Sequence, residues 1–189
     1  MAYSSVTVLY DPAEVVAAEG DGGAYGRLET LLRQAWESVD GVASQSLNAA
    51  PRVIEIPVCY EGEYGPDLEK VAAQIGLAPE EVVRLHLAKE YRVFMIGFLP
   101  GFPYLGRLDA LLKIPRKPEP MPVRAGGVGI AGMQTGVYPQ NSPGGWWIIG
   151  RTPMALFDPA ADRPALLRTG DRVRFRAISP VEFNQFSIC

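Results

Sequence analysis

The chain has 189 residues, of which 48% are hydrophobic and 21% charged, and its formal net charge at pH 7 is −3. These values are ordinary for a globular protein that buries a core without disulfides or metal. A mildly acidic chain lacks the positive surface that proteins use to bind nucleic acid or an acidic membrane, and its single histidine excludes a histidine-rich metal site.

Targeting and membrane signals are absent from the sequence. Residues 1–12 contain no basic segment followed by an apolar one, so we expect no signal peptide, and no run approaches the roughly 18 apolar residues that cross a membrane. Cys59 and Cys189 stand in no metal-binding spacing and are expected to be free thiols. We therefore expect a cytoplasmic protein that binds no metal.

The first half of the chain predicts strands and helices in alternation. Residues 5–10 alternate in polarity and are rich in β-branched side chains, which favours a strand. An amphipathic helix follows, because apolar residues fall on one helical face at Leu28, Leu31, Leu32, Ala35 and Trp36. After a polar linker at 40–52 we expect a strand at 52–58, a helix at 67–75, a helix from Pro79 to near Tyr91, and a strand at 92–97.

The second half has a different character. More than half of the 17 prolines lie between residues 100 and 153, and short β-like runs occur at 127–131, 135–138, 146–150 and 171–178. Short strands separated by Gly/Pro turns are typical of a closed or nearly closed β-barrel. Ser179 and Glu182 form a capping box that predicts a last short helix. The sequence thus predicts an α+β fold, with a small α/β part at 1–88 and a β-barrel at 89–189.

The segment 97–106, GFLPGFPYLG, places aromatic side chains on backbone that its glycines and prolines make irregular. One interpretation is structural, with the rings closing one end of the barrel. The other is functional, with Phe98, Phe102 and Tyr104 forming a rigid wall for a flat ligand or a partner protein. The composition favours neither.

A second candidate region is 134–151. The paired glycines Gly144 and Gly145 bring backbone amides close to the surface, where they can bind an anion. Neutral hydrogen-bonding groups and a guanidinium that suits a carboxylate accompany them, namely Gln134, Thr135, Tyr138 and Arg151. The alternative is a structural hairpin in which one of Trp146 and Trp147 points inward and the other outward.

Two further residues are candidates for chemistry. Arg116 lies in the polar, proline-rich segment 115–124, which is either a solvated loop or a binding strip. His86 is the only imidazole and titrates in the range useful for catalysis, although a histidine near a helix end also serves as a simple hydrogen-bonding group. The glycines form no phosphate-binding motif.

Three long motifs resemble one known family. IEIPVCYEGEYGPDL (residues 54–68), EEVVRLHLAKEYRVFMIGFLPGFPYLG (80–106) and GGVGIAGMQTGVYPQNSPGGWWIIGRTPMALFDP (126–159) are similar to the B subunit of 5-oxoprolinase. That family is also known as allophanate hydrolase subunit 1 and as the kinase inhibitor KipI, and its module is similar to half of the carboxyltransferase domain of urea carboxylase.

The resemblance implies an α/β N-terminal domain, expected to be incomplete here, followed by a cyclophilin-like barrel. It implies a companion C subunit, of the KipA or allophanate hydrolase subunit 2 type, and an A subunit, with which the chain forms an ATP-dependent complex. That complex opens the lactam of 5-oxo-L-proline to L-glutamate. No cofactor is expected on this chain alone, and catalytic candidates are His86, Arg116, Tyr138 and Arg151. Substrate-binding candidates are Phe98, Phe102, Tyr104, Gln134, Thr135, Gly144, Gly145 and Trp146.

We expect the aromatic residues of 97–106 to line a mouth shared with the partner, near His86 and the 134–146 hairpin. Exposed apolar residues on the N-terminal helix predict self-association or a tight partner. Two other functions remain open from the sequence. One is inhibition of histidine kinase autophosphorylation in the manner of KipI, and the other is a carboxyltransferase half-domain in a urea carboxylase-like system.

Overall fold

A computed structural model describes residues 8–11, 15, 23–42 and 51–186. Its contacts divide the chain into two compact units, Met1–Pro51 and Arg52–Cys189. The domain boundary that we expected between residues 88 and 89 falls inside the second unit and remains a prediction. No helix in the described ranges is long and apolar enough to cross a membrane. Cys59 is a buried free thiol, whereas Cys189 lies outside the described residues.

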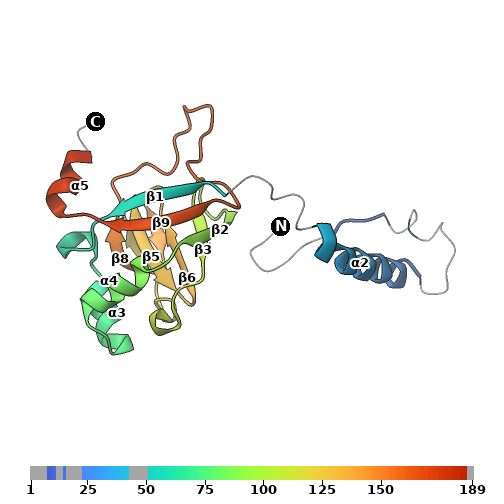
Figure 1. The fold of residues 1–189 in the computed structure, drawn as a ribbon, viewed down its shortest axis with the longest axis horizontal. Helices are drawn as coiled ribbons and strands as arrows, with labels where there is room; N and C mark the ends of the chain where they lie inside the picture. Colours follow the sequence, from blue (N-terminus) through green and yellow to red (C-terminus); the bar gives the residue numbers. More distant parts are fainter. Residues whose placement is uncertain (1–7, 12–14, 16–22, 43–50, 187–189) are drawn as a thin grey trace. The chain divides into compact units, whose positions relative to one another are not determined.

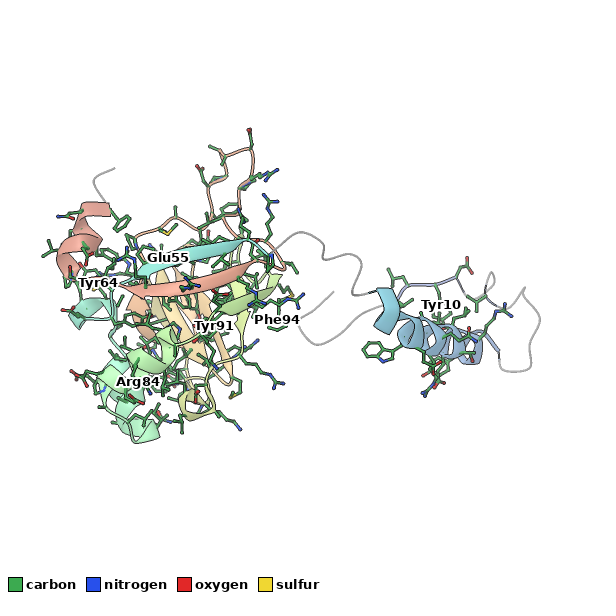
Figure 2. All side chains as sticks on the ribbon, in the orientation of Figure 1. Tyr10, Glu55, Tyr64, Arg84, Tyr91 and Phe94 are labelled. Carbon is green, nitrogen blue, oxygen red and sulfur yellow. The ribbon has the colours of Figure 1, made fainter. Side chains whose placement is uncertain are left out.

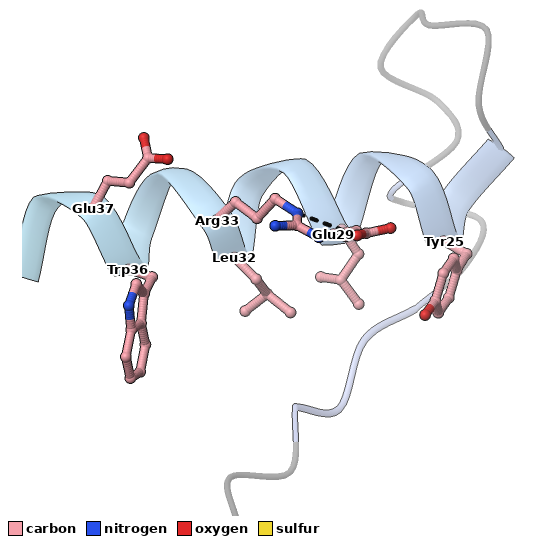
Figure 3. Close-up of a pocket in the computed structure, with 7 residues that line it drawn as sticks. Tyr25, Glu29, Leu32, Arg33, Trp36 and Glu37 are labelled. Carbon is pink, nitrogen blue, oxygen red and sulfur yellow. Dashed lines mark hydrogen bonds and ion pairs between the residues drawn. The ribbon is translucent and has the colours of Figure 1, made fainter.

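The described part of the first unit consists mainly of the predicted amphipathic helix, α2 (Gly23–Val42). Tyr25, Leu32 and Trp36 project from the same side of it (Figure 3), and Trp36 is 80% exposed. They line a pocket of about 390 Å³ along the helix, together with Leu28, Glu29, Arg33 and Glu37. Of the strand expected at 5–10, residues 5–7 are not described, and residues 8–10 form no strand.

The second unit is built on a seven-stranded sheet (Figure 1). The strands run in the order β1-β9-β2-β3-β6-β5-β8, with only β1 and β9 parallel to each other. Their bounds are Val53–Val58, Arg172–Ala177, Tyr91–Ile96, Pro103–Gly106, Gln134–Val137, Gly127–Ala131 and Trp147–Arg151 in that order. Two 2.8 Å backbone hydrogen bonds between Cys59 and Arg151 join the edge strands. The sheet is therefore a nearly closed barrel, as predicted.

Strand β9 illustrates how the sequence places residues on the two faces of the barrel. Val173 and Phe175 are buried, while the alternate residues Arg172, Arg174 and Arg176 are exposed. This is the two-residue period of a strand with one face in the core. The arginines form ion pairs with Glu90 and Glu55 across the outer surface, and Glu55 is visible there in Figure 2.

Helices α3 (Leu68–Ile75) and α4 (Pro79–Leu87) pack against each other and cover one part of the sheet (Figure 1). Gly76 ends α3 in the left-handed conformation with φ 72°, as expected. Helix α4 ends at Leu87, and the expectation that it reaches Tyr91 is wrong. Tyr91 begins β2 instead, and its buried hydroxyl donates to the carbonyl of His86 at 2.7 Å, which satisfies a free acceptor of the last helical turn.

Short elements complete the unit: 3₁₀ turns at Gly62–Tyr64 and Ala110–Leu112, and the last helix α5 (Pro180–Phe186). The predicted capping box is present, because the Ser179 amide donates to Glu182 at 2.8 Å and the Glu182 amide donates to the Ser179 hydroxyl at 3.2 Å. A separate two-stranded sheet pairs β4 (Met121–Val123) with β7 (Ser142–Gly144). The segment 115–124 is thus partly a strand.

The core has two main parts. The larger lies between the sheet and helices α3 and α4 and includes Tyr91, which is fully buried, whereas Arg84 of α4 is exposed (both are labelled in Figure 2). The smaller part consists of Phe102, Val123, Ala131, Tyr138, Trp146 and Ile148. This second cluster is rich in aromatic rings and holds the candidate site.

Candidate functional site

A cavity of about 240 Å³ lies over the smaller core cluster. Its lining comes from four separate segments of the chain, which the barrel and the β4–β7 sheet bring together. The lining residues are Phe98, Phe102, Tyr104, Arg116, Pro120, Tyr138, Pro143, Gly144, Gly145 and Trp146. We call this cavity the aromatic pocket. Eight of these ten are residues that the sequence singled out.

Phe102 is the centre of the pocket wall. Its ring centroid lies 5.0 Å from that of Tyr104, 5.2 Å from Tyr138, 5.5 Å from Phe98 and 5.6 Å from Trp146, all edge-to-face. Such packing is favourable because ring edges are positive and ring faces negative. Phe102 is buried and also lines the cavity, so the loop 97–106 packs part of the core, and its role as a wall for a ligand or partner stays a prediction.

Phe98 forms the outer lip of the pocket. It is 62% exposed and has φ 74°, the only positive value among the described residues other than glycine. A bulky side chain in this region of φ is strained, and such strain tends to occur at functional sites. The pocket therefore has a buried aromatic floor and an exposed aromatic lip.

The Tyr138 hydroxyl packs directly against the backbone of Gly144. A Cβ atom at Gly144 would lie 2.3 Å from the Tyr138 hydroxyl, so only glycine leaves room for that hydroxyl. Burial raises the pKa of the Tyr138 phenol, while the Trp146 backbone amide and the positive charge of Arg116 act in the opposite direction. The net increase in pKa keeps the phenol protonated at neutral pH, where it can donate a hydrogen bond.

Arg116 supplies the positive charge of the aromatic pocket. Its side chain is exposed and lines the cavity, and within the described part of the chain it makes no hydrogen bond or ion pair. A guanidinium offers a planar pair of donors that matches a carboxylate. No acidic side chain, imidazole or thiol is among the described residues that line the pocket. The pocket is therefore suited to binding a small, flat anion.

His86 lies elsewhere, and the expectation that the aromatic residues are near it is wrong. Thr135 points into the barrel, where its hydroxyl lies 2.9 Å from His86 Nε2. The next residue, Gly136, faces the pocket, since a Cβ there would lie 2.9 Å from Phe102 and 3.1 Å from Trp146. Successive residues of a strand face opposite sides, so β6 separates His86 from the aromatic pocket.

The histidine belongs to a buried hydrogen-bond chain. Tyr60 Oη lies 2.8 Å from His86 Nδ1, and the Thr135 hydroxyl donates to the carbonyl of Gly129 at 3.0 Å. One neutral tautomer satisfies every group, with Nε2–H donating to Thr135 and Nδ1 accepting from Tyr60. Burial lowers the pKa of His86 to about 3. These contacts support a structural role and leave its predicted catalytic role untested.

The other candidates are also outside the pocket lining. Gln134 has a buried side-chain nitrogen without a hydrogen-bond partner among the described residues. Arg151 Nε donates to the carbonyl of Ala125 at 2.8 Å, and the residue lines a different cavity of about 290 Å³ that also includes Arg124 and Glu63. Of the twelve predicted site residues, the structure gathers Arg116, Tyr138, Phe98, Phe102, Tyr104, Gly144, Gly145 and Trp146.

The tryptophan pair differs from expectation. Trp146 is buried in the pocket wall, but Trp147 is half-buried against the larger core and does not point freely outward. Its indole N–H donates to the carbonyl of Pro115 at 2.7 Å, which holds the 115–120 segment beside the barrel. Sequence reasoning missed this contact because it joins residues 32 positions apart.

Sequence reasoning also missed four residues in or near the pocket. Pro120 and Pro143 line it, and Lys117, the neighbour of Arg116, forms an ion pair with Asp67. The cluster of prolines was the one available signal for the first two. Nothing in the sequence links Asp67 with Lys117. Among the described residues no group of three or more His, Cys, Asp or Glu side chains is arranged to hold a metal ion.

Comparison with known proteins identifies close relatives. The chain is 47% identical over 186 residues to the 5-oxoprolinase B subunit of Bacillus subtilis (strain 168), covering 98% of this chain and 77% of that protein. It is 54% identical over 173 residues to the 5-oxoprolinase B subunit of Escherichia coli O157:H7, covering 91% of this chain and 73% of that protein.

A solved structure supports the fold. The conserved uncharacterized protein PH0987 from Pyrococcus horikoshii is 41% identical, with a TM-score of 0.67 over 93% of this chain and 75% of that one. The family described as carboxyltransferase domain, subdomain C and D, matches residues 1–167. The resemblance found in the motifs is confirmed. The chain belongs to the carboxyltransferase domain, subdomain C and D, family.

Proposed function

We propose that this chain acts as the B subunit of a heteromeric, ATP-dependent 5-oxoprolinase, which opens the lactam of 5-oxo-L-proline to L-glutamate. The observation that carries the proposal is the similarity to two proteins named as B subunits of 5-oxoprolinase over nearly the whole chain. That name describes those proteins as parts of a larger assembly. We infer companion A and C subunits for this chain as well.

The chemistry of the aromatic pocket supports this proposal. 5-Oxoproline is a small, flat lactam with one carboxylate. Arg116 would bind the carboxylate through charge-assisted hydrogen bonds, the protonated phenol of Tyr138 would donate to the lactam carbonyl, and the rings around Phe102 would pack against the five-membered ring. The described lining residues include no strong base or nucleophile. Under this proposal the pocket binds and orients substrate, and the partner subunits supply the ATP-dependent step.

Reconstitution tests the proposal. The chain is mixed with the companion A and C subunits, ATP and 5-oxoproline, and glutamate is measured by amino-acid analysis. We expect glutamate only when all three proteins and ATP are present, with omission of this chain as the control. Absence of glutamate from the complete assembly would make the proposal wrong.

A carboxyltransferase half-domain is a second candidate, because the matched family carries that name. Such a function requires a biotin-carrying partner, so a second reconstitution with a biotin carboxylase, urea, bicarbonate and ATP distinguishes it. Biotin-dependent carboxylation of urea, in place of ATP-dependent glutamate formation, would favour the second candidate.

A further inference from the structure

Two adjacent basic residues have different surroundings. Arg116 lines the aromatic pocket and is exposed, whereas Lys117 does not line it and is largely buried in an ion pair with Asp67. We propose that Lys117 and Asp67 form a positioning pair that holds Arg116 at the pocket as the receptor for a single substrate carboxylate. This inference rests on the proposed function and assigns a role to two residues that do not line the pocket.

The ion pair is well built. Lys117 Nζ lies 2.5 Å from Asp67 Oδ2, and the two side chains are only 12% and 10% exposed. Asp67 is itself fixed to strand β8, because its Oδ2 accepts from the Ile148 amide at 2.7 Å and its own amide donates to the Ile148 carbonyl at 3.0 Å. Because the pair is largely buried, water competes little for its hydrogen bond and screens its charges little.

The backbone on both sides of Arg116 is also fixed. Before it, the Pro115 carbonyl accepts from the Trp147 indole at 2.7 Å. After it, the Lys117 amide donates to the Gly145 carbonyl at 2.8 Å, and Gly145 lines the pocket. Lys117 Nζ lies 5.3 Å from the centre of the Trp147 ring. Arg116 therefore lies between two residues whose backbone is fixed by hydrogen bonds, and this keeps the Arg116 backbone beside the pocket wall.

The Lys117–Asp67 ion pair also affects the net charge near the aromatic pocket. Arg116 is the only charged side chain among the described residues that line the pocket, and the charge of the neighbouring Lys117 is balanced by Asp67. One net positive charge in a small aromatic cavity favours a monoanion. The predicted ligand class is accordingly a small cyclic amide with one carboxylate, and the carboxylate is the part of the ligand that depends on the positioning pair.

The test uses the complete complex and two ligands that differ only in the carboxylate. The KM for 5-oxoproline is measured together with the Ki of pyrrolidin-2-one, which is the same ring without the carboxylate. In Lys117→Met we expect the KM to rise roughly tenfold, as for loss of a charged hydrogen bond, with the Ki unchanged and kcat within about twofold. Lys117→Arg, which can still pair with Asp67, should restore most of the affinity.

Control variants separate positioning from damage to the fold. Lys113→Met removes an exposed lysine from the same region and should change neither constant. Because Lys117→Met leaves Asp67 buried without its partner, the double variant Asp67→Asn/Lys117→Met repeats the measurement without that charge. The inference is wrong if the KM and Ki rise together in both variants, or if neither changes.

Failure of the proposed function would be recognisable separately. If the wild-type complex forms no glutamate, the proposed function is wrong, and the positioning pair is then judged by calorimetric titration of the same complexes with both ligands. Loss of the preference for 5-oxoproline over pyrrolidin-2-one in Lys117→Met supports the pair. A preference equal to that of the wild type overturns it.

Discussion

Individual residues in this chain acquire their roles from burial and partners. Arg116 and His86 were both predicted as catalytic candidates, yet one is exposed at a pocket and the other is fully buried in a hydrogen-bond chain. A charged group facing a cavity can act on a ligand, whereas a buried neutral imidazole stabilises the fold. Each difference leads to a measurable prediction.

Replacing Arg116 with Gln should weaken binding of the anionic substrate. We expect the KM of the reconstituted complex for 5-oxoproline to rise by at least about tenfold, because a hydrogen bond to a charged group contributes about 1.5–3 kcal/mol. The stability of the chain should not change, since the side chain is exposed. Steady-state kinetics measure the effect, with Arg107→Gln, another exposed arginine, as the control. Equal effects of the two substitutions would exclude Arg116 as the carboxylate contact.

His86 should make the protein less stable as the pH falls. Its pKa is about 3 in the folded state and about 6.5 when unfolded, so between these values the unfolded chain binds one more proton. The contribution of His86 to the free energy of unfolding is therefore complete above about pH 6.5, and it declines by about 1.4 kcal/mol per pH unit as the pH falls below that value. Urea unfolding between about pH 7 and pH 5 measures this slope.

The matched variant for this prediction is His86→Gln, whose amide does not titrate. The variant should be less stable than the wild type near pH 7, because the buried chain through Tyr60 and Thr135 is disturbed. Its stability should depend less on pH. As the chain has one histidine, no other imidazole contributes, and an unchanged slope would contradict the assignment.

At the scale of elements, strand β6 and helix α2 show how amphipathic patterns are used. Strand β6 separates the buried hydrogen-bond chain of His86 from the aromatic pocket, with Thr135 facing His86 and Gly136 facing the pocket. Helix α2 has the apolar face that the sequence predicted, and this face is exposed in the structure (Figure 3). An exposed apolar face of this kind often contacts another molecule.

We predict that α2 makes the chain self-associate. Sedimentation velocity at increasing concentration should show a mass above that of the monomer. The double variant Leu32→Ser/Trp36→Ser, which removes two exposed apolar side chains of the face, should shift the equilibrium toward monomer. Thr30→Ala, which changes a position outside the pocket along α2, is the control. A wild-type chain that stays monomeric at micromolar concentration would contradict the prediction.

At the scale of the whole molecule, the barrel is complete within the second unit. The first strand, β1, pairs in parallel with the last, β9, and Cys59 joins Arg151 to connect the sheet edges. The first and last strands of this unit are therefore held in the same sheet, and the core and the aromatic pocket lie entirely within this unit.

A fragment that begins at Arg52 should consequently fold without the first unit. We expect residues 52–189 to unfold cooperatively, with a Tm within a few degrees of that of the full chain, because the contacts of the barrel do not require residues 1–51. Thermal unfolding followed by circular dichroism measures this. A fragment without a cooperative transition would show that the first unit is needed for stability.

Much of this architecture followed from the sequence. The strands near 53–58, 91–96, 127–131 and 172–177 and the capping box of α5 were predicted at nearly the observed bounds, and the amphipathic helix was predicted from its apolar residues between Leu28 and Trp36. Periodicity and capping depend on neighbouring residues, so local patterns suffice to reveal them. The aromatic segment 97–106 and the glycine pair at 144–145 were also recognised as unusual, and both line the pocket.

The tertiary structure decided which of these residues meet. It brought Arg116 to the pocket and paired its neighbour Lys117 with Asp67, 50 positions away in the chain, and it enclosed His86 behind β6. These outcomes depend on the order of strands in the barrel and on which side of a strand each side chain faces. A single sequence specifies the period of that alternation, but only packing against distant segments determines which side becomes the core and which becomes the site.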